Sequence, residues 1–378
     1  MPHATSTRID TLTELLTHLV RMPTVSTEPD TNRAALDWVE LQLAGLPLNI
    51  QRLENRGFAT LVATTTGTAN PKSPRLWLAA HMDVVSGHPE DFQPHVQDGR
   101  LFGRGSHDMK FAIATYIALL QDLGATLAGY DLGLLLTCDE ELGGSHGVGW
   151  LVNDQGYRGG AVLLPDSSTP WKLEIGGKGI LWWQVTSTGR SAHASKPWQG
   201  LNAIDEIMKF VAHVRANFPV EPCGDQEHKH PTLNLATFVA GTSTNKVPDS
   251  AVARIDVRYT SDLNPETISG WFTEAATKVP SVTLKSMREA DLPYQVQPSR
   301  VGSRFAAIAR EVTGKAIESH TAHGSSDARW FAWKGVPTIN VGITGSGYHT
   351  SPEWVSLHDL NQFYQITHRF VTEQAKNS

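Results

Sequence analysis

The chain of 378 residues has little cysteine and no long apolar run. It contains only two cysteines, Cys138 and Cys223, which are too few for a disulfide framework or a cysteine-rich structural zinc site. No run of about 18 apolar residues occurs, so no transmembrane helix is expected. The N-terminal segment lacks the charged-then-apolar layout of a signal peptide. These absences predict a cytoplasmic protein that does not enter a membrane.

The chain also lacks a basic surplus. Lys and Arg number 32 against 38 Asp and Glu, and the net charge of −6 argues against nucleic-acid binding. There is no Gly-x-Ser-x-Gly elbow of the serine hydrolases, and the glycines around Lys178 do not form a phosphate loop. With 40% apolar and 19% charged residues, the composition is globular, and the length suggests two domains.

Four short apolar segments predict buried strands, at residues 76–80, 132–138, 161–164 and 338–341. Continuous apolar runs of this kind are typical of strands that are covered on both faces of a sheet. Apolar residues at helical spacing after Asp108 and over 305–312 predict helices between these strands. Alternating strands and helices indicate an α/β fold, with a doubly wound mixed sheet.

The middle of the chain has a different order of elements. Strands are predicted at 179–188, 232–241, 251–259 and 281–285, with helices over 201–217 and after Pro265. This β-α-β-β-α-β order is that of ferredoxin-like domains. We therefore expect an inserted domain at 177–291, and a catalytic domain formed by 1–176 and 292–378.

Histidine and acidic residues follow the predicted strands of the catalytic domain. Ligands in α/β folds bind beyond the carboxyl ends of strands, and six of these side chains are expected there: His81, Asp83, Glu140, Glu141, Asp166 and His349. Asp83 lies two positions after His81, on the same side of an extended segment, where it could orient the imidazole as metal-binding histidines require. Asp108 precedes a predicted helix, where an N-cap is the simpler interpretation.

The acidic triplet at 139–141 also has two interpretations. It could be a solvated turn, or it could be neutralised by a divalent cation. One Glu could then bind metal while its neighbour acts as general base. Two histidines and four carboxylates at one sheet edge match the needs of a site for two zinc ions, with Co²⁺ or Mn²⁺ as possible substitutes.

Four motifs, in order along the chain, resemble those of one family of dinuclear zinc metallopeptidases and deacylases. They are HMDVV at 81–85, GRGSHDMK at 103–110, DEE at 139–141 and GRSAHA at 189–194. The family includes acetylornithine deacetylase, succinyl-diaminopimelate desuccinylase, aminoacylase and glutamate carboxypeptidase. The resemblance extends over nearly the whole chain and includes the inserted domain, which it implies to be a lid and dimerisation domain.

The resemblance implies a role for each matching residue. Asp108 would bridge two zinc ions, often through a cis peptide bond to Met109; one ion would be completed by His81 and Asp166, the other by Glu141 and His349. Asp83 would orient His81, and Glu140 would be the general base. His193 would reach across a homodimer to polarise the scissile carbonyl. Substrate contacts are implied for Lys178, Asn245, Arg258 and Gly324.

The resemblance leaves the substrate open. Residues 342–353 do not match the desuccinylase pattern, because Gly345 stands where an Asn that helps to bind the succinyl group is expected. Phe111 stands where relatives often have Gly, and Asp166 is shorter than the Glu that many use. We expect hydrolysis of an N-acyl amino acid; the alternatives are a dipeptidase or carboxypeptidase and, more remotely, a non-catalytic metal-binding module. Glu140 favours an enzyme, because a binding module needs no base.

Overall fold

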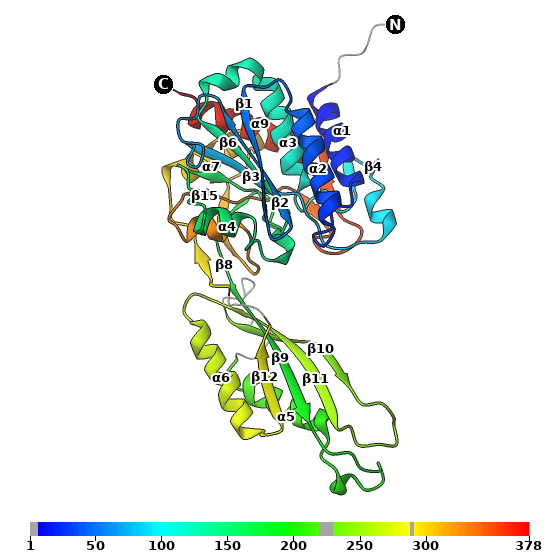
Figure 1. The fold of residues 1–378 in the computed structure, drawn as a ribbon. Helices are drawn as coiled ribbons and strands as arrows, with labels where there is room; N and C mark the ends of the chain where they lie inside the picture. The colour runs from blue at the N-terminus through cyan, green and yellow to red at the C-terminus, as the bar shows by residue number, and fades with distance from the viewer. Residues whose placement is uncertain (1–6, 219–229, 288–290, 378) are drawn as a thin grey trace. The chain divides into compact units, whose positions relative to one another are not determined.

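The computed structural model describes residues 7–218, 230–287 and 291–377 (Figure 1). Cys223 lies outside these residues. The chain divides into two compact units: the first comprises Met1–Ile175, Gln295–His320 and Ser326–Ser378, and the second Gly176–Tyr294 and Thr321–Ser325. The chain passes between the units four times: within the short strands β8 (Lys172–Gly177), β13 (Tyr294–Gln295) and β14 (Glu318–Ala322), and between Ser325 and Ser326.

The first unit is built on a six-stranded mixed sheet, in the order β1-β2-β6-β3-β7-β15. Its strands are β1 (Leu48–Asn55), β2 (Phe58–Thr65), β3 (Leu76–His81), β6 (Leu132–Thr137), β7 (Val162–Leu163) and β15 (Thr338–Ile339). The four predicted strands are confirmed: they are adjacent in the sheet and parallel. The antiparallel hairpin of β1 and β2 was not predicted.

Helices cover both faces of this sheet. Along β3, Leu78 packs into a core on one face and Trp77 into a second core on the other, as the alternation of a strand requires. The first face carries α1 (Arg8–Arg21), α2 (Pro29–Gln42), α3 (Lys110–Leu123), α7 (Arg300–Thr313) and α9 (Leu357–Gln374). The second face carries α4 (Val148–Asn153) and α8 (Ala328–Ala332).

Helix α3 is the central helix of the larger core. Among the described residues, Lys110–Gly129 is the one segment long and apolar enough to cross a membrane, and 67% of it is buried inside the protein. The same apolar character is therefore explained by packing against the sheet and the neighbouring helices. A small antiparallel sheet, order β16-β17-β5-β4, lies elsewhere in this unit, with strands Gly345–Ser346, Trp354–Ser356, Arg100–Phe102 and His95–Gln97.

The second unit has a four-stranded antiparallel sheet in the order β10-β11-β9-β12. Its elements in chain order are β9 (Gly179–Thr188), α5 (Ala203–Arg215), β10 (Thr232–Ala240), β11 (Ser250–Tyr259), α6 (Pro265–Lys278) and β12 (Val282–Ser286). Each strand and helix predicted in this region is present. Apolar residues of both helices and of the sheet form one separate core, including Phe210, Phe272 and Ile255.

Candidate metal centre

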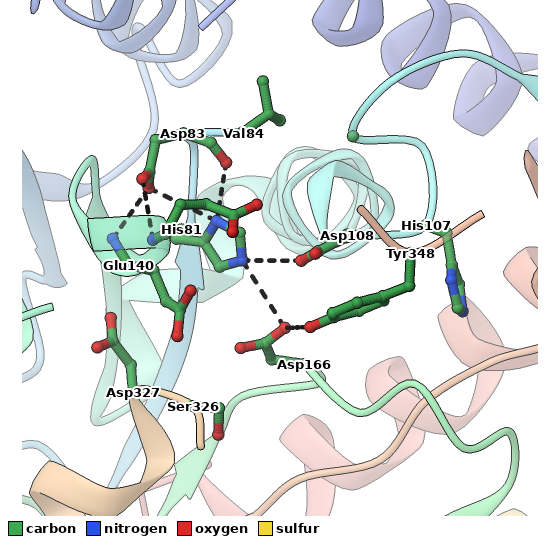
Figure 2. A network of polar contacts seen from close by, with 12 residues as sticks. His81, Asp83, Val84, His107, Asp108, Glu140, Asp166, Ser326, Asp327 and Tyr348 are labelled. Carbon is green, nitrogen blue, oxygen red and sulfur yellow. Dashed lines mark hydrogen bonds and ion pairs between the residues drawn. The ribbon is translucent and has the colours of Figure 1, made fainter. Parts of the chain in front are cut away.

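Asp108 lies between His81 and His349, and Figure 2 shows its contact with His81. Its Oδ1 is 3.1 Å from Nε2 of His81, and its Oδ2 is 3.2 Å from Nε2 of His349. The residue comes directly before α3, and its peptide bond to Met109 is cis. The carboxylate thus offers one oxygen to each side, which is the geometry of a bridging ligand. Its side chain forms no N-cap hydrogen bond to α3, so the simpler interpretation is wrong.

Two groups of possible metal ligands lie on either side of this carboxylate. The first consists of His81, Glu140 and Asp166, and the second of Asp108, Glu141 and His349; within each group the ligand atoms all lie within 4.8 Å of one another. All five predicted ligands are therefore brought together, and Glu140, predicted as the base, lies in the first group. The residues come from segments at the carboxyl ends of β3, β6 and β7, from the segment just before α3, which carries Asp108, and from the loop between β16 and β17.

Burial and mutual repulsion dominate the electrostatics of the acidic side chains. Burial raises the pKa of Glu140 well above its usual value, and the charge of Asp166 raises it further. Burial likewise raises the pKa of Asp166 and of Glu141. Burial opposes ionisation of Asp108 too, but hydrogen bonds from His349 and His81 hold its pKa below the usual value. Without cations, the site therefore resists full ionisation of its carboxylates.

The two histidines, unlike most of the buried acidic side chains of the site, are favoured in their charged form. Burial disfavours the charged form of His81, but its contacts with Asp108, Asp166 and Asp83 outweigh burial and raise its pKa. Hydrogen bonds with Asp108 and Glu141 raise the pKa of His349 to about 10. Protons thus occupy positions between the carboxylates where metal ions would supply the positive charge.

Asp83 holds two neighbours of the site in place. Nδ1 of His81 lies 2.9 Å from the main-chain oxygen of Asp83 and 3.5 Å from its carboxylate. The closest orienting contact is therefore the carbonyl rather than the predicted carboxylate. The carboxylate accepts hydrogen bonds from the main-chain N–H groups of Glu140 and Glu141, at 3.2 Å each, and from the hydroxyl of Ser26 at 2.7 Å. Asp83 thereby fixes the turn that carries the expected base.

Glu353 was not predicted, yet it organises the loop before α3. Its side chain is 1% exposed, and it accepts hydrogen bonds from the main-chain N–H groups of Gly105, His107 and Asp108 at 2.8, 2.8 and 3.0 Å. The guanidinium of Arg104 donates to the same carboxylate at 2.8 Å. The position of Asp108 therefore depends on a residue that lies four positions beyond His349.

Position 345, where the sequence has Gly in place of the Asn of the desuccinylase pattern, has no room for a side chain. A Cβ added there would lie 2.4 Å from Cδ2 of His107 and 2.6 Å from the main-chain oxygen of Trp354. The imidazole of His107 is buried and contacts the carbonyl of Ile343 through Nε2 at 3.0 Å. An Asn side chain at position 345 does not fit this backbone, because His107 already occupies the space.

Five predicted site residues belong to the second unit: Lys178, His193, Asn245, Arg258 and Gly324. His193 is exposed, and its Nδ1 lies 2.8 Å from the hydroxyl of Ser195. The N–H of Ala194 donates to the carbonyl of Asn245 at 3.0 Å, so the loops that carry His193 and Asn245 lie together.

Lys178 and Arg258 have partners within the second unit. The Lys178 side chain is buried and donates to the carbonyl of His230 at 3.0 Å. Arg258 forms a bidentate ion pair with Asp256, at 2.8 and 3.1 Å. Gly324 lies in the short segment Thr321–Ser325, and no described atom would come within 4 Å of a Cβ there.

The donor set of the first unit fits divalent cations. It combines imidazole nitrogens and carboxylate oxygens, which suit zinc, manganese or cobalt. Buried carboxylates held this close together need a compensating positive charge. Arg104, one of the cationic side chains near the site, is engaged with Glu353.

The chain is similar to known proteins over most of its length. The model of Peptidase family M20/M25/M40 matches residues 77–373. The chain is 27% identical over 375 residues to a succinyl-diaminopimelate desuccinylase of Rhodospirillum centenum, covering 94% of this chain and 95% of the relative. It is 28% identical to the protein of that name from Phenylobacterium zucineum, with 93% and 95% covered.

Solved structures share the fold at lower identity. A tripeptidase from Staphylococcus aureus superposes with a TM-score of 0.75 at 19% identity, covering 97% of this chain and 98% of that one. A metallo-carboxypeptidase of the M20 family from Sulfolobus solfataricus gives a TM-score of 0.77 at 16% identity, with 95% and 98% covered. At these identities the likeness establishes the mixed α/β fold with several sheets.

Proposed function

This chain belongs to peptidase family M20/M25/M40 and is a hydrolase of amide bonds, and we propose that it uses two zinc ions to remove the acyl group from an N-acyl amino acid. One observation carries the proposal: Asp108 offers an oxygen to each of two ligand groups, and Glu140 lies in the first of them. In this assignment His81 and Asp166 hold one ion, Glu141 and His349 hold the other, and Asp108 bridges them.

Glu140 is the proposed general base. Two divalent ions bound in these clusters supply Lewis acidity for the amide carbonyl and lower the pKa of water. The carboxylate of Glu140 takes a proton from the attacking water and later delivers it to the leaving amine. Its raised pKa brings the group closer to the working pH, which is where a base that must also return its proton is most effective. Asp83 supports this role because it fixes the main chain of Glu140.

The second unit is proposed to be a ferredoxin-like lid and dimerisation domain. Its β-α-β-β-α-β order supports the fold assignment. The exposed imidazole of His193 is available to polarise the scissile carbonyl in a homodimer. Contacts with the substrate are proposed for Asn245, Arg258, Lys178 and Gly324. A cytoplasmic location is proposed on the same sequence grounds as before.

The surroundings of position 345 argue against succinyl as the acyl group. The curated relatives carry the name desuccinylase, but His107 fills the space that the expected Asn would need at position 345. That observation disfavours succinyl as the acyl group, and a dipeptidase or carboxypeptidase is the alternative within the same chemistry. In either case the scissile bond is an amide, and the same residues carry the reaction.

A hydrolysis screen tests the function directly. Zinc-loaded protein is offered N-acetyl, N-succinyl and N-formyl amino acids alongside dipeptides, and EDTA-treated protein is the control. We expect metal-dependent hydrolysis of one of these classes, with N-succinyl compounds disfavoured. Activity that survives complete metal removal would overturn the assignment, and so would a zinc-loaded protein that hydrolyses none of them.

Glu140→Gln tests the role of the base in the same assay. The substitution keeps the size of the side chain and removes its ability to take a proton. We expect kcat to fall at least about 100-fold while the zinc content measured by atomic emission stays at the wild-type level. Full activity with full zinc content would rule Glu140 out as the base.

A further inference from the structure

Tyr348 contacts the proposed metal centre but has no role in the reaction described above. Its hydroxyl donates a hydrogen bond to Oδ1 of Asp166 at 3.0 Å. The same carboxylate oxygen is 3.7 Å from Nε2 of His81, another member of the first ligand group. Figure 2 shows the phenol pointing at Asp166 from the opposite side to His81. The hydroxyl therefore contacts the same oxygen of a proposed ligand that lies toward His81.

The hydroxyl of Tyr348 is the donor in this contact, because an ionised carboxylate can only accept hydrogen bonds. A donor of this kind holds one carboxylate oxygen in a fixed direction, and hydrogen bonds to charged acceptors are the stronger ones.

The ring of Tyr348 is held from two sides. Its centroid lies 6.0 Å from that of His107, edge to face, and 4.8 Å from that of His349. His107 is in turn fixed by its contact with the carbonyl of Ile343. The phenol is therefore supported by packing, and the placement of its hydroxyl is built into the fold.

Asp166 needs such support. It is a short carboxylate three residues after the end of a short strand, β7, and its own main-chain N–H donates to the side chain of Asn340 at 2.8 Å. Without the phenol, its side chain could rotate away from His81. Partners that orient a ligand commonly change metal affinity about 10- to 100-fold when they are removed.

We propose that Tyr348 is a positioning residue of the first metal site: its hydroxyl fixes the carboxylate of Asp166 toward His81 and so sets the affinity of one of the two ions. This inference rests on the two-metal assignment of the proposed function. The inference goes beyond that assignment because it makes the first metal site, but not the second, depend on Tyr348, which binds no metal itself.

Tyr348→Phe tests the proposal, with Tyr116→Phe as the matched control. Phe keeps the ring and its packing and removes only the hydroxyl. Tyr116 is also buried, but its hydroxyl donates to the main-chain carbonyl of Leu163 at 3.1 Å rather than to a metal ligand. Zinc dissociation constants of each metal-free protein are measured by competition with a chromophoric chelator, and the visible spectrum of the cobalt-loaded protein is recorded.

We expect Tyr348→Phe to raise the dissociation constant of one zinc ion about 10- to 100-fold and to leave that of the other within twofold of the wild type. The spectrum of the cobalt-loaded protein should also change. Tyr116→Phe should match the wild type in both measurements. Wild-type affinities and spectrum in Tyr348→Phe would overturn the proposal, as would equal weakening of both ions. The hydrolysis screen is separate: a wild-type protein that binds two ions but cleaves no amide contradicts the proposed function and leaves this test intact.

Discussion

Oε1 of Glu353 accepts the main-chain N–H of Asp108 at 3.0 Å, so a buried carboxylate that binds no metal determines where the bridging carboxylate lies. The other oxygen of Glu353 pairs with Arg104, which is 5% exposed. Removing one partner of a buried ion pair typically costs 3–5 kcal/mol. We expect Glu353→Gln to lower the free energy of unfolding of the metal-free protein by about 3 kcal/mol, measured by urea unfolding.

Glu373→Gln is the control for this substitution. Glu373 also forms an ion pair with an arginine, Arg304, but both side chains are about one-third exposed. Exposed pairs contribute roughly 0–1 kcal/mol, so this variant should unfold within about 1 kcal/mol of the wild type. Equal losses of unfolding free energy in the two variants would show that the Glu353 pair stabilises the protein no more than a surface ion pair does.

Zinc binding should release protons, and His349 should supply one of them. The contacts with Asp108 and Glu141 raise the pKa of His349 to about 10, so the imidazole is protonated in the metal-free protein at pH 7.5. A histidine that binds metal must be neutral, and its proton leaves on binding. Calorimetric titration with zinc in two buffers of different ionisation enthalpy measures the number released.

His349→Ala provides the comparison for the proton count. The variant lacks the titrating imidazole, so it should release fewer protons than the wild type under the same conditions. If the wild type released no protons at pH 7.5, the prediction that His349 is protonated in the metal-free protein would be wrong.

The fold was predictable where local sequence reports burial. The strands at 76–80 and 132–138 are continuous apolar runs because helices cover both faces of the sheet. The hairpin of β1 and β2 gave no such signal. Strand β1 is only half-buried and alternates with charged and amide side chains, and β2 is rich in Ala and Thr although it is buried.

The site was predictable where a residue's place in the chain decides its place in space. His81, Glu140, Glu141 and Asp166 follow parallel strands, so the topology alone brings them to one edge. Glu353 and Tyr348 could not be found this way. Their partners, Asp108 and Asp166, lie 245 and 182 positions away, and only the packing of the loop after β16 brings them together.

His193→Ala should lower catalysis without removing metal. Every residue of the two ligand groups belongs to the first unit, whereas His193 is an exposed residue of the second. We expect kcat to fall, by the about 100-fold or more that removing one donor to a developing oxyanion costs, with the zinc content unchanged. His213→Ala, which removes an exposed histidine from helix α5 of the same unit, is the control. An unchanged kcat in His193→Ala would remove this residue from the mechanism.

The burial of Lys110 should make the stability of the metal-free protein depend on pH. Its side chain is fully buried and donates to the carbonyls of Leu19 and Met22 at 3.0 and 2.8 Å. Burial lowers its pKa from 10.5 to about 7. Between these values the unfolded chain carries a proton that the folded protein does not, so folding becomes more favourable as pH rises. This contribution is largest above the unfolded pKa and is lost as pH falls toward 7.

Comparison with Lys110→Met isolates this contribution from the other groups that titrate in the same range. The free energy of urea unfolding is measured for both metal-free proteins at pH 7 and pH 9, and the difference between the two proteins is compared. The wild type should gain stability relative to Lys110→Met on going to pH 9, by no more than about 1.4 kcal/mol per pH unit, the limit for one proton. Parallel pH dependence in the two proteins would mean that Lys110 stays charged when folded, so that the two carbonyls at the end of α1 and the nearby Glu353 compensate fully for its burial.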